Sequence, residues 1–374
     1  MITNNICTIQ DNTDIIKNVS FEDFVSGNAK AIVNAARVSF NNIDHEPFNK
    51  KDEKLVEYLK AHEHKSPFFH LQKTFAVSSI EWNMFCIFVM RNPLQNIFTQ
   101  DELSSVKFYV DQTNPKELFT YITISQWFYS KLLQYADVMD FQVNVIQEDF
   151  SKIKNKQAEI IKGFNHVYNT ITNPFKNLTL CLFEPTFDWL KTRANILEAS
   201  RIFIASAIVE TPLFVFNQLV KHRKAEVNAI SYRYVKPTKK KFWQPTQWRK
   251  QAETNKQGSS KTEFVEESEV YKIENNGCGN IIETEISYNS ILCDANKWYN
   301  AQIKNEMCGE LARIALPQST FTSFVWTFDL YTFARICKLR ISPNAQLETQ
   351  EVVEEVLKIV KARYPIIEDL IRLF

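Results

Sequence analysis

The stretch Gln218–Tyr234 reads QLVKHRKAEVNAISYRY and overlaps the end of the apolar run Pro212–Val220. It contains four positive charges, one histidine and three hydroxyl side chains. Fixed cations at the edge of a core suit an anionic ligand, most simply a phosphate, because guanidinium groups match its oxygens. A solvated helix end, where cations offset the helix dipole, explains the charges equally well. Charge alone therefore leaves both interpretations open.

The spacing within this stretch is more specific than its charge. A basic-His-basic triplet is followed by seven residues, a serine and then Arg-Tyr. This pattern resembles the signature of flavin-dependent thymidylate synthases, which reads Arg-His-Arg, seven residues, Ser and then Arg-Tyr. The only departure within it is a lysine for the first arginine. The matching residues are Lys221, His222, Arg223, Asn228, Ser231, Arg233 and Tyr234.

Other segments resemble the same family. AARVSF stands at 35–40 and His-x-Ser-Pro-Phe-x-His at 64–70, but the next apolar stretch ends in Val89-Met90-Arg91, where the triplet would stand. The second half holds the triplet, whereas its segment 195–201, NILEASR, has no histidine. ARIALP, FVWTF and LRISPNAQ, within 312–346, match the family again.

These complementary losses predict an α+β protein built from two tandem copies of the family's domain. Each copy is expected to be a sheet packed with long helices. We expect a degenerate copy at 1–172 and, at 173–374, a copy with the nucleotide motif and an insertion at 236–285. A single domain with a large insertion is the competing interpretation. Residues 110–180 are predicted to be helical by their pattern.

The resemblance implies methylation of dUMP to dTMP. Methylenetetrahydrofolate would supply the one-carbon unit, reduced FAD the hydride, and NADPH the electrons that regenerate the flavin. Seven cysteines stand in no motif for a nucleophile. The protein must then clamp a phosphate, polarise the uracil edge and hold a flavin. The alternatives are one-carbon transfer to another pyrimidine nucleotide and a nucleotide-binding homologue without turnover.

The resemblance also implies which residues form the site. Arg340 matches an arginine that stabilises the ionised pyrimidine, and Ser231 joins it in the catalytic group. The expected dUMP-binding residues are Gln218, Lys221, Ser231, Tyr232, Arg233, Arg313 and Arg340. The expected FAD-binding residues are Ser39, His64, Ser66, Lys221, His222, Arg223 and Asn228. The family's site is assembled between subunits, so both copies are expected to contribute. Surface ion pairs for Arg313 and Arg340, and a structural loop for His64, are the plainer alternatives.

Four positions depart from the family's pattern. Ala229 replaces a glutamate, and Phe69 stands where a flavin-contacting glutamate is expected. Asp329 and Tyr331 stand where the family has Asn and Arg among its flavin contacts. An aspartate there would place a negative charge near the flavin or its diphosphate.

Composition indicates which ligand classes and which cellular compartment fit the chain. The chain has 374 residues, a net charge of +1 and 6 glycines, so it shows no global field for nucleic acid or membrane and no Gly-rich phosphate loop. The scattered cysteines indicate reduced thiols and predict a cytoplasmic protein. The N-terminus shows no signal-peptide pattern. We expect a homo-oligomer, a dimer of two-domain chains.

Three histidines, an apolar run and a basic stretch each suggest a special function but also have a plainer interpretation. His62, His64 and His70 lack the spacing of a metal site, so no metal is predicted. The apolar run 202–220 contains Glu210 and two amides, which favours a core helix over a membrane span. The basic stretch 236–261, with Trp243 and Trp248, could stack on single-stranded nucleic acid. We favour a surface loop whose aromatic side chains pack back on the domain.

Overall fold

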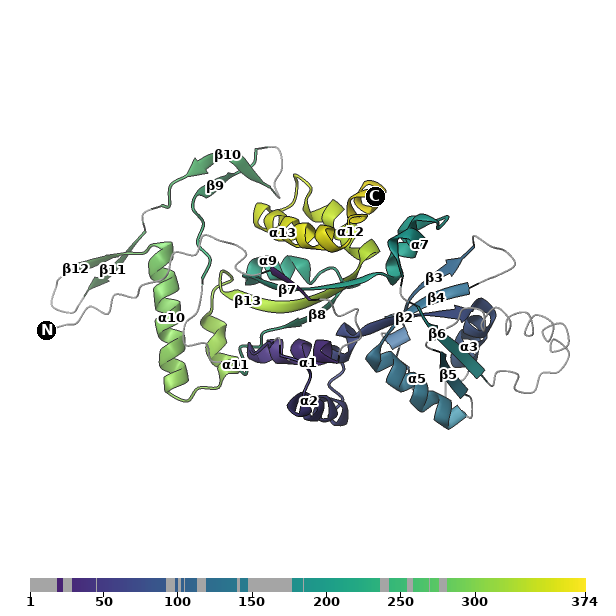
Figure 1. Ribbon diagram of the computed structural model, residues 1–374. Helices are drawn as coiled ribbons and strands as arrows, with labels where there is room; N and C mark the ends of the chain where they lie inside the picture. The colour runs from purple at the N-terminus through teal and green to yellow at the C-terminus, as the bar shows by residue number, and fades with distance from the viewer. Residues whose placement is uncertain are drawn as a thin grey trace.

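The structure is a computed structural model of the chain. It describes residues 19–22, 29–44, 46–91, 98–99, 102–103, 105–112, 119–139, 142–146, 177–183, 185–235, 242–253, 258–268, 270–275 and 281–374. Two sheets lie side by side in it, each covered by helices (Figure 1). The predicted mixture of helix and sheet is therefore confirmed.

The first sheet has five strands in the order β3-β4-β2-β6-β5. Only the β5–β6 pair is parallel. Helices α3 (Ser79–Arg91) and α5 (Gln126–Met139) share a core with one face of this sheet. The strands are β2 (Gln72–Ser78), β3 (Lys107–Asp111), β4 (Phe119–Ser125), β5 (Gln142–Ile146) and β6 (Asn177–Leu182).

The prediction that 110–180 is helical is wrong for three of these strands. β4 is buried along its whole length, and such a continuous apolar run fits a buried strand as well as a helix. β5 and β6 pair with each other at the edge of the sheet. Helix α5 does follow β4, and the predicted helix over 150–171 lies outside the described residues.

The second sheet has four antiparallel strands in the order β1-β7-β13-β8. Its two faces pack against different helices, as alternation along β13 requires. Phe324, Trp326 and Phe328 belong to the core that the sheet shares with α12 and α13. Val325 points to the other face and belongs to the core shared with α1 and α2. In Figure 1, α12 and α13 accordingly lie above this sheet and α1 and α2 below it. The strands are β1 (Val19–Glu22), β7 (Ile204–Pro212), β8 (Glu226–Ala229) and β13 (Phe321–Asp329).

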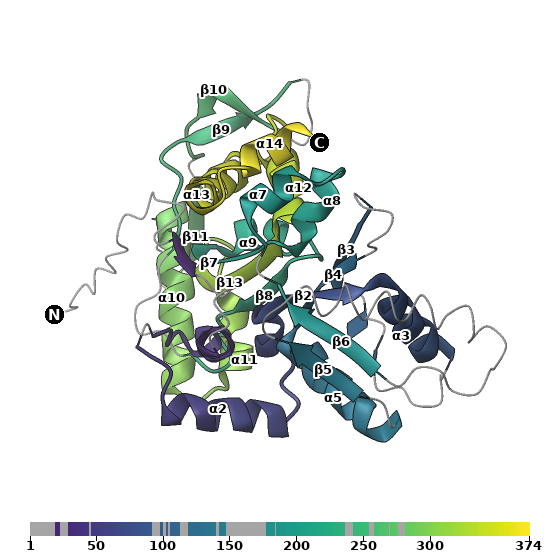
Figure 2. The same ribbon diagram turned by 45° about the vertical axis from the view of Figure 1, so that its right-hand side comes forward.

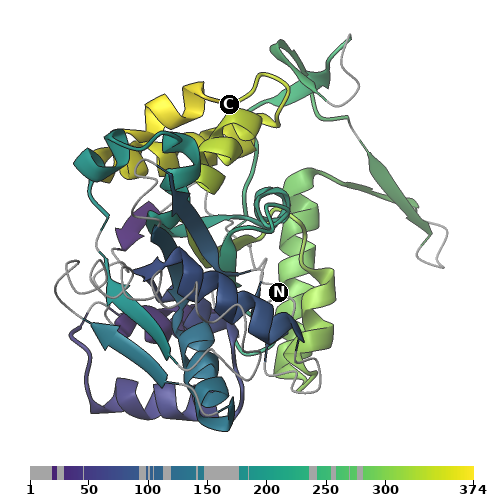
Figure 3. The same ribbon diagram turned by 90° about the vertical axis from the view of Figure 1, so that its right-hand side faces the viewer.

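The remaining elements connect and cover the sheets. Two hairpins, β9–β10 and β11–β12, belong to the insertion; the first lies above α13 and the second projects from the top of α10 (Figures 2 and 3). The helices of the first half are α1 (Lys30–Arg37), η2 (Val38–Phe40), α2 (Lys50–Ala61) and η3 (Ser66–His70). Those of the second half are α7 (Phe187–Lys191), α8 (Ile196–Ala199), η4 (Ser200–Ile202), α9 (Leu213–Leu219), α10 (Tyr288–Lys304), α11 (Gly309–Ala312), η5 (Arg313–Ala315), α12 (Leu330–Arg340), α13 (Leu347–Arg363) and α14 (Ile367–Arg372). The hairpin strands are β9 (Trp248–Gln251), β10 (Ser259–Val265), β11 (Tyr271–Asn275) and β12 (Ile281–Glu285).

Two units of the chain follow the same path. The first unit runs β2-α3-β3-β4-α5. The second unit runs β7-α9-β8-β13-α12, with the elements from β9 to η5 inserted between β8 and β13. In each sheet the last of the three strands lies between the other two, in the orders β3-β4-β2 and β8-β13-β7. The closing helix begins alike in both: Gln126 N–H donates to Leu71 O at 2.8 Å, and Leu330 N–H donates to Phe203 O at 2.9 Å.

The strand before each unit pairs with the other unit. β1 pairs with β7 through Phe21 and Ala207, and β6 pairs with β2 through Leu182 and Phe75. Both pairings cross the boundary expected near residue 172. The two sheets are therefore joined by a reciprocal exchange of strands.

Equivalent hydroxyl pairs meet where the two units touch. Thr74 and Thr123 are 2.7 Å apart, and Thr74 also donates to Ile202 O of η4 at 3.2 Å. In the second unit Ser206 and Thr327 are 2.6 Å apart, and Thr327 Oγ1 lies 2.8 Å from His70 Nδ1 of η3. Each unit thus hydrogen-bonds to the helical turn that precedes the other.

Candidate functional site

The basic triplet lies in the turn between α9 and β8. Pro212 precedes α9 with an extended backbone, and the helix ends at Leu219. His222 N–H donates to Leu219 O at 3.1 Å, and Ala225 N–H donates to His222 O at 3.0 Å. The turn leaves Lys221 and Arg223 exposed and His222 half-buried.

Arg340, the last residue of α12, reaches back to this turn. Its Nε–H donates to His222 Nε2 at 3.0 Å. Its Nη1 donates to Gln218 Oε1 at 3.3 Å, and its Nη2 donates to Gln218 O at 3.2 Å. Three predicted site residues, from α9, from the turn after it and from the end of α12, therefore meet in one cluster. Arg340 is not a surface ion-pair residue.

The protonation states in this cluster follow from burial and charge. Burial, with Arg340 and Arg335 nearby, lowers the pKa of His222 to about 4. The ring is thus neutral at pH 7 and accepts at Nε2. Burial also lowers the pKa of Arg340, but a guanidinium stays charged in proteins. The cluster therefore holds one positive charge in a fixed orientation.

The remaining predicted nucleotide residues lie at the other end of β8. Arg233 pairs with Glu310 of α11 at 3.2 Å, with both side chains about half exposed, and Arg313 follows exposed on η5. Tyr232 donates its hydroxyl to Phe321 O. A Cβ at Gly309 would lie 3.0 Å from Tyr232 O, so the close approach of α11 to this turn requires glycine.

Two contacts bring the first half of the chain to β8. Ser231 N–H donates to Ser39 O at 3.1 Å, and buried Asn228 donates from Nδ2 to Ala35 O at 2.9 Å. Helix α1 is held in place by ion pairs of Lys30 and Arg37 with Asp52, which is fully buried. The structure thus joins predicted residues of the two halves, Ser39 with Ser231.

The predicted nucleotide residues form two groups rather than one. Gln218, Lys221 and Arg340 lie near the start of β8, whereas Ser231 and Arg233 follow its end. Five residues of extended chain between Glu226 and Ser231 span about 16 Å. The recorded contacts within the described residues do not bridge the two groups.

A cavity of about 870 Å³ lies between the two units. Its lining includes Phe69, Arg223 and Asp329, three positions that the family resemblance connected with flavin. From the first half it is lined by Phe69, Leu103, Ser105, Val106, Lys107 and Phe108. From the second half it is lined by Glu198, Arg201, Arg223, Lys224, Glu226, Asp329 and Thr332.

Opposite charges balance on the wall of this cavity. Lys107 donates to Gln72 Oε1 at 2.8 Å. Burial lowers the pKa of Lys107, and the carboxylates of Asp329 and Glu226 oppose that shift. Burial raises the pKa of Asp329 and of Glu226, and Lys107 opposes both shifts. Lys107 thus offsets the negative charge that the aspartate introduces.

Asp329 and Tyr331, the departures on α12, have structural partners. Asp329 caps the helix by accepting from Thr332 N–H at 2.7 Å and from its hydroxyl at 3.0 Å. The guanidinium of Arg201 lies over the Tyr331 ring at 3.4 Å and is paired with Glu198. The aspartate's charge is therefore directed largely at its own helix.

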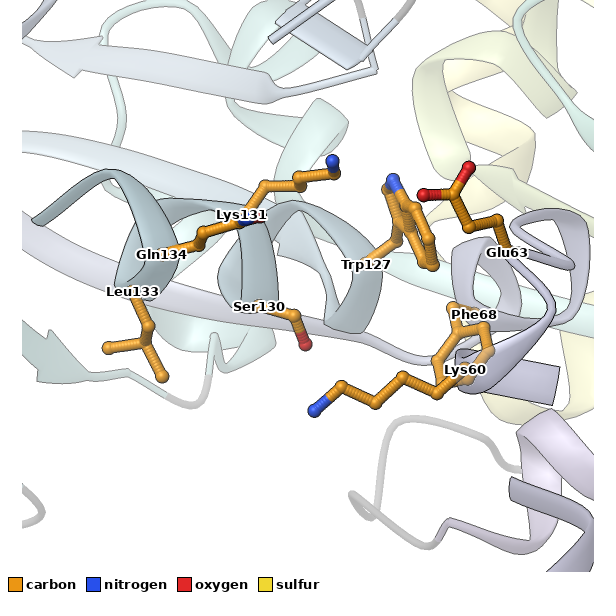
Figure 4. A pocket seen from close by; sticks show the side chains of 8 residues that line it. All are labelled: Lys60, Glu63, Phe68, Trp127, Ser130, Lys131, Leu133 and Gln134. Atoms are coloured by element: carbon orange, nitrogen blue, oxygen red, sulfur yellow. The ribbon is translucent and has the colours of Figure 1, made fainter. Parts of the chain in front are cut away.

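The histidine loop faces a second cavity. A space of about 390 Å³ lies between the loop after α2 and helix α5 (Figure 4). Its lining includes Glu63 and Phe68, so neighbouring residues of η3, Phe68 and Phe69, border different cavities. His64 is exposed, with its ring 6.3 Å from that of Tyr58, and Ser66 is also exposed. Within the described part of the chain, no hydrogen bond, ion pair or ring contact joins His64 or Ser66 to the triplet.

The aromatic residues of the stretch 236–261 pack on the domain, as we expected. Trp243 lies 5.1 Å from Phe214 of α9, and Trp248 lies 5.3 Å from Tyr288 of α10 in an edge-to-face arrangement. Arg249 of β9 pairs with Glu348 of α13. The described residues contain no cluster of His, Cys, Asp or Glu that could hold a metal, and no helix among them could cross a membrane.

Comparison with known proteins identifies the family. The model described as thymidylate synthase complementing protein matches residues 200–366, which include the triplet and Arg340. Flavin-dependent thymidylate synthase from Kosmotoga olearia is 31% identical over 225 residues, which cover 60% of this chain and 85% of that protein. The chain belongs to the flavin-dependent thymidylate synthase family.

Other relatives extend the match. The flavin-dependent thymidylate synthase of Aquifex aeolicus is 28% identical over 342 residues, 91% of this chain and 96% of that protein. A solved structure described as the UMP/dUMP methylase PolB from Streptomyces cacaoi shares 15% identity over 59% of this chain and 88% of that one. Its TM-score of 0.36 does not establish a shared fold.

Sequence reasoning missed two residues of the site. Gln346 hydrogen-bonds to Gln218, and Lys107 lines the cavity between the units. Gln346 closes the family-like segment LRISPNAQ, which carried no assigned role for it. Lys107 lies in β3, and its position beside Asp329 and Glu226 of the second unit depends on tertiary packing that no sequence pattern marks.

Proposed function

We propose that this protein methylates dUMP to dTMP, with methylenetetrahydrofolate as one-carbon donor, FAD as cofactor and NADPH as reductant. The observation that carries the proposal is the cluster of Arg340, His222 and Gln218 beside the triplet, in a chain of this family. A relative that matches 91% of this chain is named flavin-dependent thymidylate synthase.

Arg340 is the residue proposed to act on the pyrimidine. Charge develops on the ring when C5 becomes nucleophilic, and a fixed guanidinium stabilises such charge most where water is excluded. Neutral His222 and the two oxygens of Gln218 fix the guanidinium without neutralising it. The charge is therefore oriented before substrate arrives. Ser231 is proposed as the second catalytic residue, and its backbone is already held by Ser39.

The nucleotide's phosphate is proposed to meet the cations around β8. Lys221 is exposed and Arg233 is half-exposed, so both can reach a ligand from solvent. Gln218, Tyr232 and Arg313 complete the proposed set. Because the two groups lie at opposite ends of β8, we propose that one nucleotide site takes its members from two chains. The protein would then work as a dimer.

The cavity between the units is proposed to hold the flavin. Its volume of about 870 Å³ lies within the range of about 300–1,000 Å³ typical of cofactor pockets. Phe69 and Phe108 offer apolar surface for a ring, and Arg223 and Lys224 offer cations for a diphosphate. When bound, the flavin supplies the hydride that converts a methylene adduct into a methyl group. The residues present fit such a group, because Lys107 offsets Asp329.

Some of the other proposed flavin-binding residues lie near this cavity, and others lie away from it. Lys221 and His222 adjoin Arg223 in the triplet, and Asn228 and Ser39 lie along β8. His64 and Ser66 are exposed and line neither cavity, so we propose that they serve a site completed by another chain.

The two units are proposed to be tandem copies of one domain. Their common path, their equivalent hydrogen bonds at Leu71 and Phe203, and the reciprocal exchange of β1 and β6 support duplication. A boundary near residue 172, between a copy at 1–172 and a copy at 173–374, is consistent with that exchange. A large insertion in a single domain gives no reason for an equivalent register in the two sheets. We also propose that the protein works in the cytoplasm.

The test is product analysis by mass spectrometry. Protein reconstituted with FAD is incubated with dUMP, methylenetetrahydrofolate and NADPH, and dTMP is expected. Omission of any one component should remove the product, and the variant Arg340→Ala should lower its rate of formation about 100-fold or more. Parallel reactions with other pyrimidine nucleotides test the alternative substrate that Ala229 would permit. Bound nucleotide without any methylated product would instead support a binding protein.

A further inference from the structure

We propose that Gln346 is a positioning residue for Arg340 and acts through Gln218. The inference rests on the proposed function, since it assumes that Arg340 serves the reaction. Gln346 lies immediately before α13 and is half-buried. Its Oε1 accepts a hydrogen bond from Gln218 Nε2.

The backbone around Gln346 is fixed. Gln346 O accepts from Thr349 N–H and from Gln350 N–H, each at 3.0 Å. The side chain of Gln350 closes the same turn by donating to Ala345 O at 2.6 Å. Thr349 and Gln350 are buried, so this end of α13 is a firm support. Gln346 can therefore hold Gln218 from outside the triplet.

The contact goes with one orientation of the Gln218 amide. A glutamine amide has one accepting oxygen and one donating nitrogen. With Nε2 directed at Gln346, Oε1 is left to accept from Arg340 Nη1 at 3.3 Å. A flipped Gln218 amide would turn N–H groups toward a guanidinium, which has only donors. By accepting at Oε1, Gln346 thus supports the one orientation of Gln218 that holds Arg340.

The insertion hairpin strengthens this support. Arg249 of β9 pairs with Glu348, which is 2% exposed and stands two residues after Gln346. Arg249 also donates from Nε to Ser259 Oγ of β10 at 2.9 Å. The hairpin therefore clamps the first turn of α13, from which Gln346 extends.

The test compares Gln346→Leu, Gln346→Glu and the control Asn344→Leu. Leucine removes the acceptor at similar volume, glutamate keeps an acceptor, and Asn344 is exposed in the same loop. We expect Gln346→Leu to lower kcat for dTMP formation about tenfold, the size of one lost hydrogen bond that leaves its partner unsatisfied. KM for dUMP should change less than kcat. Glutamate should restore most of the rate, and Asn344→Leu should match wild type.

A double-mutant cycle separates positioning from simple packing. In an Arg340→Ala background, Gln346→Leu should cause no further loss of kcat, because the residue it positions is gone. An equal loss in both backgrounds would overturn the proposal. So would a wild-type rate in Gln346→Leu.

A spectroscopic measurement tests the same claim without turnover. The ¹⁵N resonance of His222 Nε2, recorded at pH 7.5 on the full chain, reports whether that nitrogen accepts from Arg340. We expect it to shift in Gln346→Leu and to return in Gln346→Glu. An unchanged resonance in the leucine variant would overturn positioning. If wild type forms no dTMP, the proposed function fails, and this measurement still decides the role of Gln346.

Discussion

The first and second units share a path but differ in what they carry. Both run strand, helix, strand, strand, helix, with the same strand order and the same hydrogen bond at the start of the last helix. In the second unit that helix ends in Arg340, whereas the matching position of α5 is the buried Ala136. The triplet of the second unit is matched by Val89-Met90-Arg91 in the first.

The difference teaches that scaffold and chemistry are specified separately. Buried apolar residues form the cores of both units. The proposed chemistry depends on a few polar positions that the second unit has and the first unit lacks. The two units also carry opposite charges at equivalent positions where they meet. Lys107 of β3 is paired with Thr123 in the first sheet, and Glu226 of β8 is paired with Thr327 in the second.

The largest expected effect is the loss of Arg340. Arg340→Ala should lower turnover about 100-fold or more, as the loss of one donor to a developing anion does. Arg340→Lys should restore only part, since lysine lacks the planar fork that reaches both His222 and Gln218. Lys338→Ala, an exposed change on the same helix, is the control. Near-normal turnover in Arg340→Ala would remove this residue from the mechanism.

A smaller loss is expected at the far end of β8. Arg233→Ala should weaken dUMP binding by about 1.5–3 kcal/mol, the contribution of a charge-assisted hydrogen bond. We expect a value toward the lower end of that range because the Arg233 side chain is half-exposed. Lys221→Ala, at the other end of β8, should act similarly. Calorimetric titration with dUMP measures the change. Unaltered affinity in both variants would contradict the assignment of the phosphate to these cations.

A change in the histidine loop should alter FAD binding rather than dUMP binding. His64→Ala is expected to weaken FAD binding while dUMP affinity stays within a few-fold, because this loop belongs to the first half of the chain. Mixing the His64→Ala and Arg233→Ala proteins should restore some activity, since some shared sites would carry neither change. A monomeric protein, or unchanged flavin content in His64→Ala, would favour a purely structural loop.

The junction between the units should make stability depend on pH. Burial is the main reason that the pKa of His70 is lowered to about 4, with Asn228 and Lys107 acting in opposite directions. The unfolded chain binds a proton below its ordinary pKa of 6.5, so stability is full above that value and falls between pH 6.5 and 4. At pH 5 the loss from this residue is about 2 kcal/mol.

Denaturant unfolding at pH 7.5 and 5.0 measures this dependence. His70→Gln should flatten it, and His62→Gln, at an exposed histidine of the same loop, should not. His222, whose pKa is also about 4, adds a contribution of the same sign. An equally steep loss in His70→Gln would exclude His70 as a cause.

No effect on chemistry is expected from single cysteine replacements. Burial raises the pKa of Cys337 and of Cys86, which disfavours their thiolates. Each of the seven cysteines is changed singly to Ser or Ala, and dTMP formation is followed. A well-folded variant that binds dUMP but forms no dTMP would reveal a cysteine nucleophile.

The sequence predicted the polar cluster better than the path of the chain. The family resemblance marked Gln218, His222 and Arg340, and those residues meet because the end of α12 lies against the turn between α9 and β8. β4 was mistaken for helix because a fully buried strand has no alternation. The exchange of β1 and β6 could not be predicted, since each strand's partner is chosen by tertiary packing about 100 or more residues away.

The number of flavins bound per chain tests the account most directly. Protein saturated with FAD is freed of excess ligand, denatured and assayed for released flavin against chain concentration. One FAD per chain is predicted, because only the second unit keeps the triplet beside the cavity. Two per chain would show that the first unit also retains a site, and none would contradict the assignment of the cavity to flavin.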